Sequence, residues 1–117
     1  MRAKLWFRLQ IGGTQWGIYF GGPLDKLEGL CDSHKARVYL SPRLTRSRVY
    51  DVLFHELAHA SNFMCGADKS LAGALGADEE DMYDVEEVFV STAMHHLFVT
   101  LSQAGWLQLP EIPEWIK

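Results

Sequence analysis

The first third of the chain carries short apolar and aromatic runs separated by glycines, which is the pattern of β-strands joined by tight turns. We expect strands at residues 4–11 and 15–20, a short one around 29–32, and a last one at 36–40. The segment Asp32-Ser33-His34-Lys35 is turn-like, so the last two strands are predicted to form a β-hairpin.

The next stretch changes to the spacing of an amphipathic helix. Ser41-Pro42 suits its start, with serine as the N-cap and proline in the first helical position. Gly66 suits its end, directly after Cys65. The face of this helix that we expect to turn inward carries Val52, His55, Glu56, His59 and Phe63.

A second helix is expected from about Met82 to Ala104, because Gly105 follows it and the acidic residues 78–81 suit the positive end of its dipole. Residues 66–76 are rich in glycine and alanine and are predicted to connect the two helices. The tail that follows the second helix contains two prolines and is expected to be extended.

These elements predict one α+β domain over residues 1–117, with a small N-terminal antiparallel or mixed β-sheet followed by two long packed helices. A hydrophobic content of 48% is enough for a core. The net charge of −4 argues against nucleic acid as a partner. No apolar run reaches the ~18 residues of a membrane span, and the charged N-terminus has no apolar stretch like that of a signal peptide. Because two cysteines make no disulfide framework, we expect free thiols and a cytoplasmic location.

The most informative segment is His55-Glu56-Leu57-Ala58-His59, which reads H-E-x-x-H, the zincin signature. Residues four apart lie on one face of a helix, so both imidazoles can reach one Zn²⁺. Glu56 directly follows the first of them and can take a proton from metal-activated water without binding the metal. The flanking residues are uncharged, which favours a dry site. We therefore predict that His55 and His59 bind zinc and that Glu56 is the catalytic base.

A catalytic zinc usually has three protein ligands, so a third must come from elsewhere. The metzincin spacing would require glycine and histidine where the chain has Asn62 and Cys65. The alternative is a glutamate on the second helix, either Glu86 or Glu87. At about 100° per residue, Glu86 falls near the centre of that helix's apolar arc and Glu87 toward its edge, which favours Glu86. A third interpretation leaves both glutamates partly solvated. The arc comprises Val85, Phe89, Val90, Ala93, Met94, Leu97 and Leu101.

Other polar side chains have open roles. The transition-state oxyanion needs a donor, for which Tyr50, Tyr83, His95 and His96 are the candidates. A fourth protein ligand, Cys65 or His96, would instead close the site and make the zinc structural. The chain would then be an inactive zinc-binding module that recruits a protein partner, and a metal-free domain with core histidines is the remaining possibility. The tail segment PEIPEWIK could also lie in the cleft and hold the protein latent.

With these features the chain resembles the minimal gluzincin metallopeptidases, including small phage-encoded H-E-x-x-H proteins. The resemblance rests on GIYFGG, GLCDSHKARVYLS, VLFHELAHA and VEEVFVSTAMHHLF in that order, which together span most of residues 15–101. The H-E-x-x-H core is the specific part, whereas the sheet and the second helix match by pattern.

The resemblance implies Zn²⁺ held by His55, His59 and Glu86, with Glu56 as general base in a metalloendopeptidase that cleaves a peptide or protein substrate. It also implies that the strand at 38–40 is an edge strand that pairs with the substrate. The chain departs from the larger gluzincins because it lacks the domain that forms their second cleft wall. It also has Val90 where an aspartate often braces a zinc-binding histidine. The oligomeric state stays open.

Overall fold

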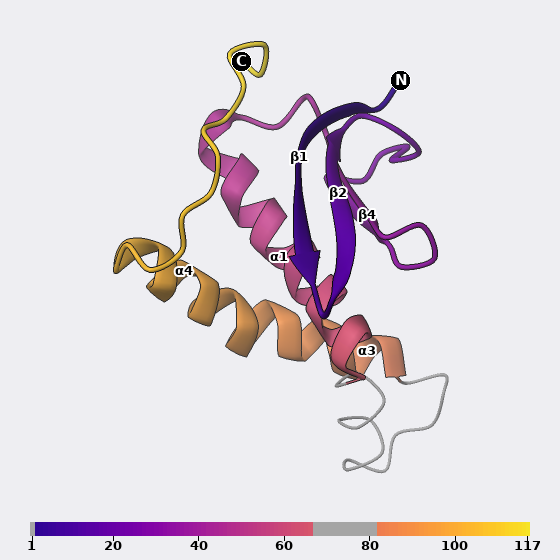
Figure 1. Cartoon of the computed structure of the whole chain (residues 1–117), viewed down its shortest axis with the longest axis vertical. Helices are drawn as coiled ribbons and strands as arrows, with labels where there is room; N and C mark the ends of the chain where they lie inside the picture. The colour runs from indigo at the N-terminus through magenta and orange to yellow at the C-terminus, as the bar shows by residue number, and fades with distance from the viewer. Residues whose placement is uncertain (1, 67–81) are drawn as a thin grey trace.

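The computed structural model describes residues 2–66 and 82–117 and confirms the α+β class, with a small mixed sheet followed by helices (Figure 1). The strands are β1 (Lys4–Ile11), β2 (Thr14–Phe20), β3 (Gly29–Asp32) and β4 (Arg37–Leu40). The helices are α1 (Arg46–Cys65), α3 (Met82–Phe89) and α4 (His95–Gln103), with the π-helical turn η1 (Val90–Met94) between the last two. The predicted connection after Gly66 and the acidic segment 78–81 lie outside the described residues.

The sheet has the order β1-β2-β4-β3. Antiparallel pairing joins β1 to β2 and β3 to β4, which confirms the predicted hairpin, and β2 and β4 are parallel. The expectation that 38–40 lies at an edge is wrong, because β4 has β2 on one side and β3 on the other. The outer strand on this side of the sheet is β3.

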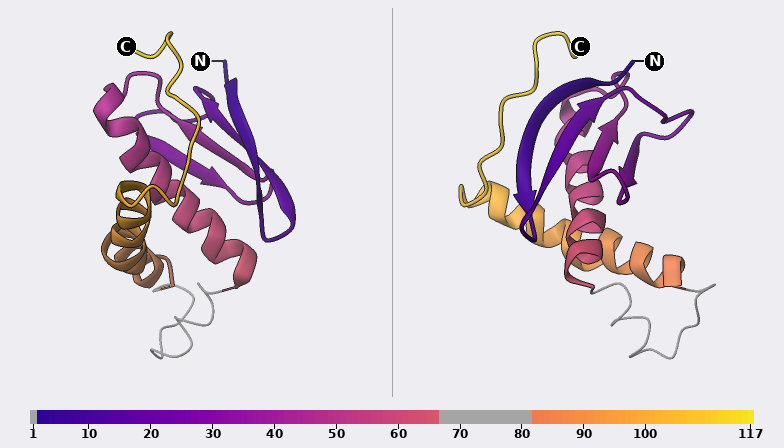
Figure 2. Two further views of the ribbon diagram at one scale, coloured as in Figure 1. Left: turned by 60° about the vertical axis from the view of Figure 1, so that its left-hand side comes forward. Right: turned by 45° about the vertical axis from the view of Figure 1, so that its right-hand side comes forward.

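Helix α1 lies between the sheet and the helical segment formed by α3, η1 and α4, as Figure 2 shows from two sides. Its inner face packs on the sheet in a core of large apolar side chains that includes Trp16, Ile18, Phe20, Val38, Leu40, Val49, Leu53 and Leu57. On its other side Phe54 stacks on Phe98 of α4, with the ring planes 7° apart and the centroids at 5.6 Å. Both layers therefore fix α1, and with it the H-E-x-x-H motif.

The predicted start of α1 at Ser41-Pro42 is wrong by several residues. The Ser41 hydroxyl accepts a hydrogen bond from Arg43 N, and Leu44 N donates to the Ser41 carbonyl, so these residues form a separate turn. The turn places Leu44 in the core, and the chain is extended again at Thr45, the N-cap of α1. The predicted end is confirmed, because Gly66 takes the left-handed conformation at φ 73°.

The second helical segment covers nearly the predicted residues and ends just before Gly105, which has φ 77°. It is not a regular α-helix throughout, because the π turn η1 inserts an extra residue into its middle. From this turn onward the burial follows the regular phase only in part. Ala93 and Leu97, which the regular phase places inside, are exposed, whereas Met94 and Leu101 of the predicted arc are partly buried. Phe98, which lies outside that arc, is also partly buried.

The C-terminal tail is extended, as predicted, and packs against β1 and the first turns of α1. The Arg46 guanidinium donates hydrogen bonds to the carbonyls of Ile112, Pro113 and Ile116. Trp6 Nε1 donates to the Glu111 carbonyl, and the Ile116 side chain is buried. The tail contributes no residue to the two pockets around the H-E-x-x-H motif, so the alternative in which it lies in the cleft is wrong, whereas Trp115 packs edge to face on Phe20 of the core. Across residues 2–66 and 82–117, none of the helices has both the length and the apolar character that spanning a membrane would require.

Candidate metal centre

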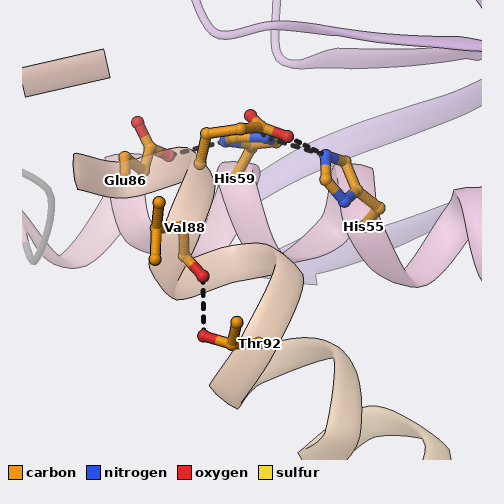
Figure 3. A network of polar contacts seen from close by, with 6 residues as sticks. His55, His59, Glu86, Val88 and Thr92 are labelled. Atoms are coloured by element: carbon orange, nitrogen blue, oxygen red, sulfur yellow. Dashed lines mark hydrogen bonds and ion pairs between the residues drawn. The ribbon is translucent and has the colours of Figure 1, made fainter. Parts of the chain in front are cut away.

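His55 and His59 lie one turn apart on the regular helix α1, so the i, i+4 spacing brings their rings together. Their Nε2 atoms are 3.3 Å apart, and the rings meet edge to face with centroids at 4.9 Å. Figure 3 shows both side chains projecting from α1 toward α3. The sequence prediction that these two histidines share one site agrees with this geometry.

Glu87 of α3 reaches both of these ring nitrogens. Its Oε1 lies 2.7 Å from His55 Nε2, and its Oε2 lies 3.0 Å from His59 Nε2. One ligand atom from each of these three residues lies within 4.8 Å of the other two, which makes them a group that could hold a metal ion. The carboxylate is partly buried, with 34% of the side chain exposed.

Glu86 occupies a different position from the one that helical phase predicted. Its Oε1 lies 2.7 Å from His59 Nδ1, on the far side of the ring from the three converging atoms (Figure 3). Glu86 is more buried than Glu87, as the phase argument required, but it meets a histidine nitrogen rather than the centre of the group. The sequence-based choice of Glu86 as third ligand therefore differs from the structure, which brings Glu87 to that place. The physical reason is that burial does not decide which ring nitrogen a carboxylate meets: Glu86, the more buried of the two, reaches His59 Nδ1, whereas the less buried Glu87 reaches Nε2.

The donor set suits a zinc ion in three respects. Tetrahedral zinc with Zn–N distances of about 2.0–2.1 Å has neighbouring ligand atoms about 3.3–3.4 Å apart, close to the observed Nε2 separation. Both ring nitrogens of His59 face carboxylate oxygens, so each must present a proton or a metal ion. The carboxylates of Glu56, Glu86 and Glu87 gather around only two imidazoles, and a divalent cation would offset this excess of negative charge.

Glu56 lies beneath the group on the buried side of α1, with 7% of the residue exposed. Burial raises the pKa of its carboxyl to about 7; the nearby Glu87 and Glu86 add to the increase, and His59 opposes it. Within the described part of the chain its Oε2 is buried without a hydrogen-bond partner. A carboxylate with a free buried oxygen and a pKa near neutrality is suited to accept a proton from a small ligand such as water.

Gly29 of β3 lies against this carboxylate. A Cβ at Gly29 would stand 2.9 Å from Glu56 Cγ and 2.8 Å from a methyl group of Val52, too close for any other residue without movement. This contact could not be predicted from the glycine alone, because strand order and the distance between β3 and α1 depend on tertiary packing. The absence of a side chain brings the outer strand of the sheet directly over the candidate base.

Two adjoining cavities, of about 570 and 260 Å³, open at this point and share Leu27, Gly29, Glu56 and His59. The larger cavity also contains His55, Glu87 and His95, and its far end carries charged side chains, namely Lys26, Glu28, Arg48 and Asp51. The smaller one is more apolar, with Leu30, Cys31 and Phe63 in its lining. The cleft is therefore lined mainly by charged side chains in the larger cavity and by more apolar side chains in the smaller one, and Gly29 lines both.

The other candidate ligands do not join the group. Asn62 is buried inside the continuous helix α1, so the metzincin turn is not formed there. Cys65 is exposed, and its thiol donates to the Asn62 carbonyl. His96 is exposed and lines neither cavity. Burial raises the pKa of the Cys31 thiol to about 12, which keeps it uncharged and unsuited to bind a metal.

The oxyanion candidates also separate. The Tyr50 hydroxyl donates to the Pro110 carbonyl in the tail contact, away from both cavities. The Tyr83 side chain lies outside the described part of the structure. His95 is the one described candidate that lines the larger cavity.

Comparisons of the chain with protein-family models, with curated proteins and with solved structures each found no match.

Proposed function

We propose that the protein is a zinc-dependent metalloendopeptidase of the gluzincin type, in which His55, His59 and Glu87 hold the metal. The observation that carries the proposal is the convergence of two Nε2 atoms and one carboxylate beside a buried glutamate that has a free oxygen. A structural zinc site needs no such carboxylate next to its ligands. Both cysteines are free thiols, which agrees with the cytoplasmic location that we include in the proposal.

Each residue of the site has a separate task. Bound zinc would polarise the scissile carbonyl and activate the attacking water as a Lewis acid. Glu56 takes the proton of that water as its oxygen adds to the carbonyl carbon. Glu56 then passes the proton to the leaving nitrogen, and the C–N bond breaks to give a carboxylate and an amine.

Glu86 takes the part of the missing brace in this proposal. Its carboxylate accepts a hydrogen bond from Nδ1–H of His59, which fixes the ring and leaves Nε2 free for the metal. Counted from Glu87, the position four residues on, where the resemblance leads us to expect a bracing aspartate, is the exposed Ser91. Glu86, directly before the metal-binding Glu87, would thus take the bracing role that an aspartate after the glutamate usually has.

The outer strand β3 is the element best placed to hold a substrate. No strand pairs with its outer side among the described residues, and Gly29 brings its backbone over Glu56. An extended peptide that pairs with β3 would run between the two unlike ends of the cleft. The proposed substrate is therefore a peptide segment in extended conformation.

The test is a comparison of wild type and Glu56→Gln, both loaded with zinc and incubated with a quenched-fluorescent peptide library. We expect the variant to bind zinc within a few-fold of wild type and to lose at least about 100-fold in kcat, the lower range for a general base. Equal cleavage by both proteins would contradict the role of Glu56. Zinc binding without cleavage by wild type would favour the alternative, an inactive zinc module that recruits a protein partner.

A further inference from the structure

The π turn η1 separates Glu87 from the one further histidine in the larger cavity, His95. His95 follows Glu87 by eight residues, and in a regular α-helix two side chains with this separation point about 80° apart. A π turn takes up one more residue than an α turn, so one turn of each kind spans eight residues. Glu87 and His95 therefore face the same cavity, although the two residues do not have the spacing that a regular helix would need.

His95 is separate from the metal-binding group. Its ring nitrogens do not belong to the set formed by His55, His59 and Glu87 among the described residues, yet its side chain is partly buried in the same cavity. Gly29 lines that cavity from the sheet, and α1 lies between the sheet and α4. His95 and Gly29 therefore line one cavity, the first from α4 and the second from β3.

We propose that η1 is a positioning element that makes α4 the second wall of the cleft, and that His95 holds a bound peptide there through a hydrogen bond from its imidazole. This inference rests on the proposed peptidase function and adds a residue that contacts substrate. A peptide would be held by the backbone of β3 on one side and by His95 on the other. The wall that larger enzymes build from another domain would here come from one helix with one extra residue.

The test separates peptide contacts from metal contacts with two probes. Acetyl-Ala-Leu-Ala hydroxamate carries a zinc-binding group and a peptide, whereas acetohydroxamate carries the zinc-binding group alone. We expect His95→Ala to weaken binding of the tripeptide hydroxamate to the zinc-loaded protein about 10-fold, the value of one hydrogen bond of about 1.4 kcal/mol. Acetohydroxamate binding should not change, and His95→Gln, which keeps a donor, should recover part of the loss. His96→Ala is the matched control, because its exposed neighbouring ring lines neither cavity.

Deleting Thr92 tests the π turn itself. After the deletion, Glu87 and His95 are separated by seven residues instead of eight. In a regular α-helix two side chains with this separation point within about 20° of the same direction. We therefore expect the deletion variant to bind the tripeptide hydroxamate like wild type. If a folded, zinc-loaded deletion variant bound it as weakly as His95→Ala, alignment by η1 would be refuted.

Equal loss of both probes in His95→Ala, or no loss of either, would overturn the role of His95. Neither outcome depends on turnover, so a wild type that cleaves no peptide would contradict the proposed function while the binding comparison still decides the inference. With a cleaved peptide, the His95→Ala loss should appear in KM, and a loss confined to kcat would contradict a holding role.

Discussion

The two helical segments that form the candidate metal centre differ in regularity. Helix α1 is an unbroken α-helix of 20 residues, and its two histidines lie where the i, i+4 spacing puts them. The segment of α3, η1 and α4 covers nearly the same residues as the predicted helix but contains a π turn. Its carboxylates precede this turn, whereas His95 follows it and lies where the spacing of a regular helix does not put it.

The difference shows how far a periodic sequence pattern can predict the position of a side chain. A motif contained in one regular turn depends on backbone geometry alone, and packing needs only to keep the helix intact. A phase argument over four turns adds up any irregularity between its ends. Helical phase placed Glu86 on the more buried side, but it could not show which carboxylate meets the two Nε2 atoms, because that depends on how α3 packs against α1.

The largest expected effect tests the regular side of this comparison. His59→Ala removes the ring that contacts both Glu86 and Glu87, so it should lower zinc affinity by at least about 1000-fold, beyond the 10–100-fold of an indirect contact. Competition with a fluorescent chelator would measure this. His96→Ala on α4 serves as the control and should bind zinc like wild type. A His59→Ala protein within 10-fold of wild type would refute the centre.

A smaller effect concerns the buried base on α1 in the metal-free protein. Because the pKa of Glu56 is about 7 in the folded state, against an ordinary value near 4.5, the folded protein keeps a proton that the unfolded chain releases. This group therefore lowers the free energy of unfolding as pH rises from about 4.5 to 7, by roughly 2 to 3 kcal/mol in total. Glu56→Gln has no carboxyl group at this position, so its free energy of unfolding should not show this decrease.

Urea unfolding of wild type and Glu56→Gln, both with chelator present, would measure this difference at pH 5 and pH 8. The variant should gain stability relative to wild type between these two values. A difference that stays constant with pH would contradict the buried, unpartnered state of this carboxyl.

The smallest expected effect tests the irregular side. In η1 the Thr92 hydroxyl donates a 2.7 Å hydrogen bond to the Val88 carbonyl, at the turn where the regular ladder is interrupted (Figure 3). Thr92→Val should lower the free energy of unfolding by less than about 1 kcal/mol, because the group is exposed. Thr100→Val in the regular helix α4 is the matched control. Equal effects of the two substitutions would show that the Thr92 bond has no special part in the turn.

Much of the fold could be predicted because its signals are local. Strands β1 and β3, the hairpin turn and the glycine ends of both helical segments follow from short-range pattern and from the left-handed conformation that glycine accepts. The start of α1 could not be predicted, since Ser41 and Thr45 are both acceptable N-caps. The choice between them depends on burying Leu44 in the core.

The candidate site divides in the same way. The roles expected for His55, Glu56 and His59 follow from one helical turn, whereas the choice between Glu86 and Glu87 depends on how α3 packs against α1. Which strand lies at the edge depends on the pairing of β2 with β4, a parallel contact that no local pattern announces. The position of Gly29 over Glu56 follows from that strand order together with the packing of α1.

The central claim is that Glu87 binds the metal and Glu86 braces His59, and zinc titration of Glu87→Ala beside Glu86→Ala tests it most directly. Wild type should bind one zinc per chain. Glu86→Ala should weaken binding by about 10–100-fold, the usual loss for a residue that orients a ligand, and Glu87→Ala should weaken it further. A Glu86→Ala protein that loses zinc more completely than Glu87→Ala would contradict the account and restore Glu86 as the third ligand.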